Sequence, residues 1–98
     1  MAQTVNTRKL ALDTLLAVSR DGRQSHLAVS DTLEMYRFLP ERERAFYVRL
    51  VEGTLENRLL WDYYINAFSS VPTARMKPAI REILRMAVCQ LRSLSAVY

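Results

Sequence analysis

The sequence predicts an all-α fold, an antiparallel bundle of four to five helices. Apolar residues recur at intervals of three and four along several segments, which is the spacing of one face of a helix. No segment shows the strict alternation of apolar and polar residues that is typical of a strand. Only two glycines and three prolines interrupt the 98 residues, and the short connections between helical segments favour packed neighbours.

The first two helices are expected at about 7–20 and 27–36. Asn6 is a good N-cap for the first helix, because its side chain can accept a hydrogen bond from a free backbone N–H. Gly22 is the expected stop after this helix, since glycine tolerates the left-handed conformation found there. Ser25 is the expected cap of the second helix.

A third helical segment follows Pro40, which fits the first turn of a helix because no backbone N–H is needed there. Glu41 and Glu43 then lie where the helix dipole favours negative charge. The apolar spacing extends to about Tyr64, with Gly53 in the middle. Gly53 either breaks this segment into two helices or lets the backbone of a neighbour approach closely. The expected core side chains are Phe46, Leu50, Val51 and Leu55.

The last helix is expected from about Pro78 to Leu94, after a loop at 69–72. It has the most regular apolar face of the chain, with the spacing of one side of an amphipathic helix. The face consists of Ile80, Ile83, Leu84, Ala87, Val88 and Leu91.

The composition favours a nucleic acid or an acidic partner. The net charge is +4, and twelve of the fourteen basic residues are arginines. The planar guanidinium group matches phosphate geometry and stacks on bases better than an ammonium group does. Ten carboxylates are interspersed among the arginines, so a merely solvated helical surface is an equally good interpretation of the composition.

No enzyme active site, cofactor site or metal site is expected. Gly22 and Gly53 stand alone, so they form no phosphate-binding loop, and His26 is the only histidine. Cys89 is the only cysteine, which excludes a disulfide framework and zinc-ligand spacing, and we expect a buried, inert thiol. Without an apolar run of about 18 residues or a signal peptide, the expected location is the cytoplasm, with no membrane contact.

Arg8 and Lys9 are the first candidates for RNA binding. Both lie in the first turn of the first helix, where the dipole disfavours cations by about 0.3–1 kcal/mol. A helix start that meets phosphates could hold this pair, and a solvated helix start could tolerate it at little cost. The two interpretations are equally supported by the sequence.

Three further arginines, Arg44, Arg81 and Arg85, are weaker candidates. Arg44 follows Glu41 by three residues, so a surface ion pair could account for it. Arg81 and Arg85 lie opposite the apolar face of the last helix, where a charged stripe usually faces water. Trp61 is expected in the core rather than stacked on a base.

Several segments between Arg8 and Leu94 together resemble the NusB-like helical domain, both in their order and in their separation. Single segments are weakly specific, and their combination is more specific. The matching segments are residues 8–16, 43–46, 50–55, 83–86 and 90–91.

The stretches at 60–65 and 76–84 look more like one branch of that family, the N-terminal domain of Sun-type ribosomal RNA cytosine-C5 methyltransferases. In that branch a separate S-adenosylmethionine-binding domain does the chemistry, and nothing in these 98 residues resembles it. The resemblance therefore implies a non-catalytic domain that binds ribosomal RNA. The other branch, the transcription antitermination factor, implies a protein-interaction module that pairs with a ribosomal protein. A helical packing domain without a ligand is the third interpretation.

The chain departs from the family pattern in three places. Glu56 stands where the family often has arginine, and Cys89 replaces a common tyrosine. The family also continues past Leu94 with further helices, so we expect a single domain over 1–98 that lacks the end of the fold. Part of the apolar face at 80–91, or the aromatic cluster at 61–64, would then have no partner in the chain and would drive self-association.

Overall fold

The computed structural model describes residues 5–94, and this part of the chain contains five α-helices and no strand. A 3₁₀ turn (Thr73–Arg75) precedes the last α-helix, and a π-helical turn (Gln90–Leu94) extends it. The predicted all-α class and the number of helices are confirmed. The helices are α1 (Thr7–Ser19), α2 (Ser25–Met35), α3 (Glu41–Glu56), α4 (Arg58–Phe68) and α5 (Pro78–Cys89).

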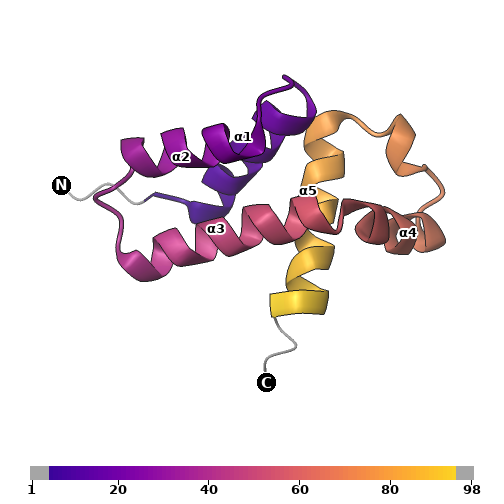
Figure 1. Cartoon of the computed structure of the whole chain (residues 1–98). Helices are drawn as coiled ribbons and strands as arrows, with labels where there is room; N and C mark the ends of the chain where they lie inside the picture. Colours follow the sequence, from indigo (N-terminus) through magenta and orange to yellow (C-terminus); the bar gives the residue numbers. More distant parts are fainter. Residues whose placement is uncertain (1–4, 95–98) are drawn as a thin grey trace.

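The other four helices form two groups around α3, α1 with α2 and α4 with α5 (Figure 1). Helices α1 and α2 lie along one part of α3, and α4 extends from its far end. Helix α5 crosses α3 steeply and also packs against α1 and α4. Helix α1 therefore contacts α2, α3 and α5, and its burial holds the two groups together.

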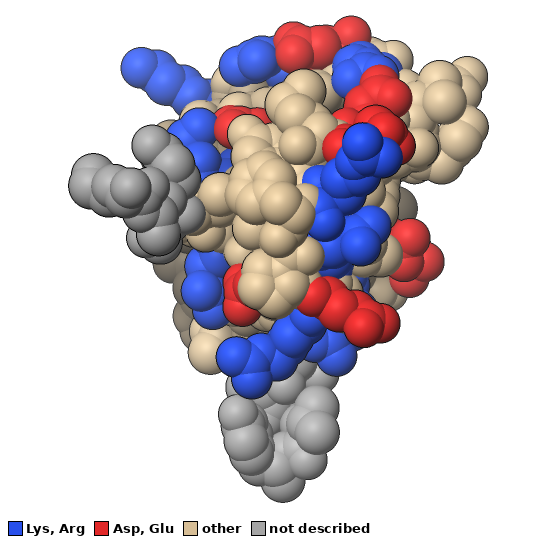
Figure 2. Space-filling model, turned by 90° about the vertical axis from the view of Figure 1, so that its left-hand side faces the viewer, with Lys and Arg blue, Asp and Glu red and all other residues tan. Residues whose placement is uncertain are grey.

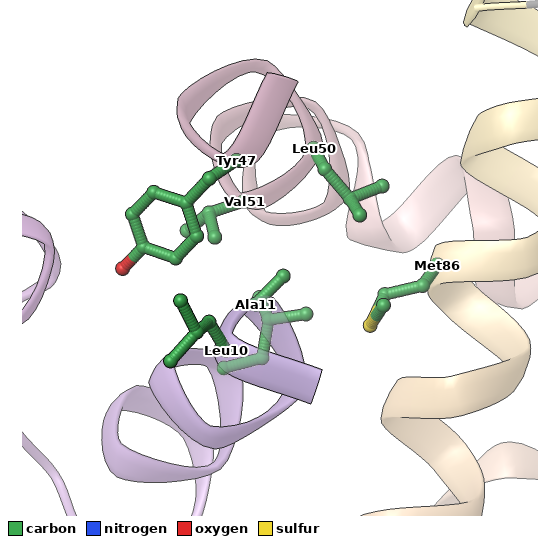
Figure 3. Close-up of a cluster of buried hydrophobic side chains, with 7 residues drawn as sticks. Leu10, Ala11, Tyr47, Leu50, Val51 and Met86 are labelled. Carbon is green, nitrogen blue, oxygen red and sulfur yellow. The ribbon is translucent and has the colours of Figure 1, made fainter. Parts of the chain in front are cut away.

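The core lies where α1, α3 and α5 meet (Figure 3). Tyr47 is buried on α3, and its hydroxyl lies 2.6 Å from the hydroxyl of Thr14 on α1. Phe46 is half-buried and packs against the edge of this core without belonging to its buried cluster. Tyr47 begins the i, i+3, i+4, i+7 stripe that faces α1, so Phe46 falls on its edge. The core cluster is Leu10, Ala11, Leu15, Tyr47, Leu50, Val51 and Met86.

Two of the predicted helix starts need correction. Asn6 caps α1 as expected, because its side chain accepts a 3.1 Å hydrogen bond from the Lys9 backbone N–H. Ser25 is the first residue of α2 rather than its cap; Gln24 holds that position without a side-chain hydrogen bond. Pro40 likewise lies just before α3 and not in its first turn.

Gly53 does not break the helix; the break falls at Asn57, between α3 and α4. A neighbour does approach Gly53 closely, but with a side chain and not with the backbone that was expected. A Cβ atom at Gly53 would lie 3.0 Å from the Sγ of Cys89, which is buried on α5. The carbonyl of Gly53 also accepts a 3.1 Å hydrogen bond from Nε1 of the buried Trp61, and this bond ties α4 back to α3.

The apolar face of α5 is largely exposed, with Ile80 at 50%, Ile83 at 47% and Leu91 at 72% exposure, which agrees with the expectation that part of this face is left uncovered. The buried residues of α5 are instead Glu82, Met86 and Cys89. A polar face can pack inward here because its charges are compensated: Arg85 pairs with Glu82 and with a carboxylate of α4. Among residues 5–94, no helix is long and apolar enough to cross a membrane.

Candidate nucleic-acid interface

The start of α1 is fixed against the start of α3. Thr7 is buried, and its hydroxyl donates a 2.7 Å hydrogen bond to Oε1 of Glu43. This bond holds the first turn of α1 beside the first turn of α3, so the basic side chains of the two turns share one surface. Glu43, predicted to complement the helix dipole of α3, therefore also positions α1.

Arg8 lies where three elements meet. Its guanidinium carbon is 5.2 Å from the centre of the Phe46 ring on α3, within the range of a cation–π interaction. Its Nε donates a 3.3 Å hydrogen bond to the side-chain oxygen of Gln90, in the π-helical turn. The side chain is exposed, so the guanidinium group is held in place and still accessible from solvent.

Lys9 is exposed next to Arg8, and its Nζ lies 2.9 Å from a carboxylate oxygen of Asp13. The side chains of Lys9 and Asp13 are 63% and 54% exposed. An exposed pair of this kind contributes about 0–1 kcal/mol, so a phosphate could replace Asp13 as the partner of Lys9 at little cost.

A recess of 460 Å³ opens between α1 and α3 beside these residues; we call it the α1–α3 recess. Three arginines and one carboxylate border it, together with the half-buried ring of Phe46. Arg42, Phe46 and Arg49 stand at i, i+4 and i+7 of α3, so one helix face presents two cations with an aromatic ring between them. That spacing was visible in the sequence, but Phe46 was assigned to the core. The lining residues are Val5, Thr7, Arg8, Arg42, Glu43, Phe46 and Arg49.

Arg44 lies on a different face of α3 and faces α2. The predicted ion pair with Glu41 is absent from the ion pairs of the described residues. The Nε atom of Arg44 is buried and has no hydrogen-bond partner within the part of the chain that the structure describes. The structure therefore does not bring Arg44 together with Arg8 and Lys9.

Arg81 and Arg85 face inward, so their interpretation as a solvated stripe is wrong. The side chain of Arg85 is 11% exposed and makes a double hydrogen bond, 2.7 Å each, with Asp62 of α4. The hydrogen bond with Asp62 raises the pKa of the Arg85 guanidinium above its ordinary value. Arg85 also donates a 2.8 Å hydrogen bond to Glu82, and Arg81 lies 3.5 Å from the same carboxylate. Both cations are thus engaged with carboxylates, and that of Arg85 joins α5 to α4.

The surface at this end of the molecule has mixed charge. In Figure 2, basic side chains border an uncharged central patch, and acidic side chains are interspersed among them. A polyanion would therefore meet local groups of arginines rather than one continuous positive face. Within residues 5–94, no group of three or more His, Cys, Asp or Glu side chains could hold a metal ion. His26 is exposed, and Cys89 is buried as expected.

Comparisons of the sequence with known proteins identify its family and one relative. The sequence profile of the NusB family matches residues 5–97. The chain is 26% identical over 92 residues to a protein of Bacillus subtilis (strain 168) named probable ribosomal RNA small subunit methyltransferase B. The similarity covers 94% of this chain and 20% of that relative, so the chain spans about a fifth of the relative's length. No solved structure matches the chain.

Proposed function

Because this chain belongs to the NusB family, we propose that it is an RNA-binding accessory domain of a ribosomal RNA cytosine-C5 methyltransferase. The observation that supports this function best is the α1–α3 recess, where three arginines surround the ring of Phe46. Guanidinium groups bind phosphates, and an aromatic ring offers a face or edge to an unpaired base. The proposed location is the cytoplasm.

Arg8 and Lys9 form one side of the proposed RNA surface, and Arg42 and Arg49 form the other. Thr7 and Glu43 hold the two sides together through their hydrogen bond. RNA binding by such a group of exposed cations releases counterions and is therefore strongly dependent on salt. Arg44, Arg81 and Arg85 lie outside this surface, because Arg44 faces α2 and the other two are engaged with buried carboxylates.

The test is RNA binding as a function of salt, measured by fluorescence anisotropy with a single-stranded fragment of small-subunit ribosomal RNA. Replacing Arg8 and Lys9 together, or Arg42 and Arg49 together, by alanine should flatten the slope of log K against log salt by about 1.4 in each case. The matched control replaces the exposed Arg58 and the exposed Arg75, which removes the same charge away from the recess. Equal losses in the control and the recess variants would contradict the proposed surface.

We expect no methyl transfer by this chain alone, since the resemblance assigns the chemistry to a separate S-adenosylmethionine-binding domain. The experiment incubates the chain with labelled S-adenosylmethionine and ribosomal RNA. Incorporation should stay at the level of a blank without protein. Reproducible incorporation that depends on the chain would refute the accessory role.

A protein-interaction role, as in transcription antitermination with a ribosomal protein as partner, is the alternative. The exposed apolar side chains on α4, on α5 and in the π-helical turn after α5 favour a protein contact and support the proposal of self-association. Light scattering over a dilution series tests self-association, which should appear as a mass that rises with concentration. A constant monomer mass would refute it. The most exposed of these side chains are Leu59 (80%), Tyr63 (70%), Phe68 (92%) and Leu91 (72%).

A further inference from the structure

A second hollow, a groove of 620 Å³, runs between α2 and α3; we call it the α2–α3 groove. Val29 and Leu33 of α2 form one apolar side and Leu55 of α3 forms the other, all three half-buried, above the fully buried Val51. Ala28 is the only buried residue of α2, so the side chains that α2 turns toward the groove are not closed off by α3. The groove thus presents half-buried apolar side chains that the described part of the chain covers only in part.

The two ends of the groove differ in charge. Helices α2 and α3 are joined by a short turn and run antiparallel, so the groove extends from the end of α3 to its start (Figure 1). Glu52 and Glu56 border the first end, and both are exposed and form no ion pair within the described residues. Arg44 borders the other end with its buried, unpartnered Nε. Glu34 and Arg37, also at this end, pair with each other at 3.4 Å.

We propose that the α2–α3 groove binds an amphipathic helix of a protein partner. Eleven residues of α2 span about 16 Å, so the groove fits roughly three turns of a helix whose apolar side chains recur at i, i+4 and i+7. A basic residue at one end of that helix would neutralise Glu52 and Glu56. An acidic residue at the other end would supply the hydrogen-bond acceptor that the Nε of Arg44 lacks.

The charges make RNA a poor occupant of this groove. Phosphates would be repelled at one end by Glu52 and Glu56, and apolar side chains line the middle of the groove, where a phosphate finds no cation. The α1–α3 recess uses Arg42, Phe46 and Arg49, which lie on the opposite side of α3. The groove proposal therefore does not depend on the proposed RNA function, and the two can fail separately.

The test uses two synthetic, capped 14-residue helical peptides with the same leucine spacing. The first has glutamates in its first turn and lysines in its last turn, and the second has glutamates in both. Titration of the ¹⁵N-labelled chain should show binding of the first peptide with shifts centred on Val29, Leu33, Val51 and Leu55. Its affinity should exceed that of the doubly acidic peptide by about fivefold, as expected for one exposed charge contact.

The Glu52→Lys/Glu56→Lys variant should reverse this preference, and both substitutions are at exposed positions that leave the core intact. The matched control, Arg8→Ala/Lys9→Ala, should leave peptide affinity unchanged. Equal affinity for both peptides, an unchanged preference in the lysine variant, or no binding at millimolar peptide would overturn the proposal. Groove shifts that appear with RNA, or with rising protein concentration alone, would also overturn it, because they would assign the groove to RNA or to a second copy.

Discussion

Arg85→Met removes the cation that joins α4 to α5, and we expect it to be the most damaging single substitution on α5. The guanidinium group lies between two carboxylates, at 2.7 Å from Asp62 and 2.8 Å from Glu82. Glu82 is fully buried, and its Oε1 already has no hydrogen-bond partner within the described residues. Methionine fills much of the same space but leaves the Glu82 charge uncompensated.

Breaking a buried ion pair on one side costs about 3–5 kcal/mol. Two features favour the lower end of this range. Arg81 remains 3.5 Å from Glu82, and the side chain of Asp62 is 17% exposed to solvent. We therefore expect a loss of about 3 kcal/mol in the free energy of unfolding, and a Tm lower by roughly 12–24 °C. The raised pKa keeps Arg85 charged at any pH below its ordinary value, so its own titration adds no pH dependence in the neutral range.

Urea denaturation followed by circular dichroism measures this loss. In a Glu82→Gln background, Arg85→Met should cost less than about 2 kcal/mol, because only the partly exposed charge of Asp62 then loses its partner. The control is Lys9→Met, which breaks an exposed pair and should cost less than about 1 kcal/mol. A loss below 1 kcal/mol for Arg85→Met, or equal losses in both backgrounds, would refute the compensated-charge explanation of the α5 face.

Two further predictions concern stability. Gly53→Ala should destabilise the chain by about 1 kcal/mol despite the better helix propensity of alanine, because the added Cβ meets the Sγ of Cys89. In a Cys89→Ala background the same substitution should become neutral or stabilising. Urea titration of the four variants would show both effects. The hydrogen bond with Arg20 lowers the pKa of the exposed Asp21 carboxyl, so this pair stabilises the fold above the ordinary carboxyl pKa and loses that effect as pH falls through the folded value. Arg20→Gln should return the pKa to its ordinary range in an NMR titration, and an unchanged pKa would contradict this.

The helices could be predicted from the sequence because their signals are local. The Asn6 cap, the loop before Pro78 and the apolar spacing each involve residues within a few positions, and the structure has helices at all those places. The break at Asn57 was not predicted, and the role of Gly53 stayed open until its packing against Cys89 was seen. A glycine within a helical segment can mark either a close neighbour or a helix break, and the sequence does not distinguish the two. Only the position of α5 in the structure does so.

The orientation of α5 could not be predicted, because it depends on a distant residue. Periodicity placed Ile80, Ile83 and Leu91 on one apolar side, but Asp62, 23 positions before Arg85, makes burial of the polar side possible. A single sequence does not reveal such a pair. The same limit applies to the candidate site: the first turn of α1 was identified, whereas the contribution of Arg42 and Arg49 depends on the Thr7–Glu43 bond between helices.

The most direct test of the proposed function is to determine which residues of the chain RNA contacts. Titration of the ¹⁵N-labelled chain with a single-stranded fragment of ribosomal RNA, followed through backbone amide and arginine Nε–Hε signals, gives that location. We predict that the largest shifts occur at Arg8, Lys9, Arg42, Phe46 and Arg49, and that they diminish as salt increases. Shifts concentrated on α4 and α5, or no shifts at low salt, would contradict RNA recognition by the α1–α3 recess.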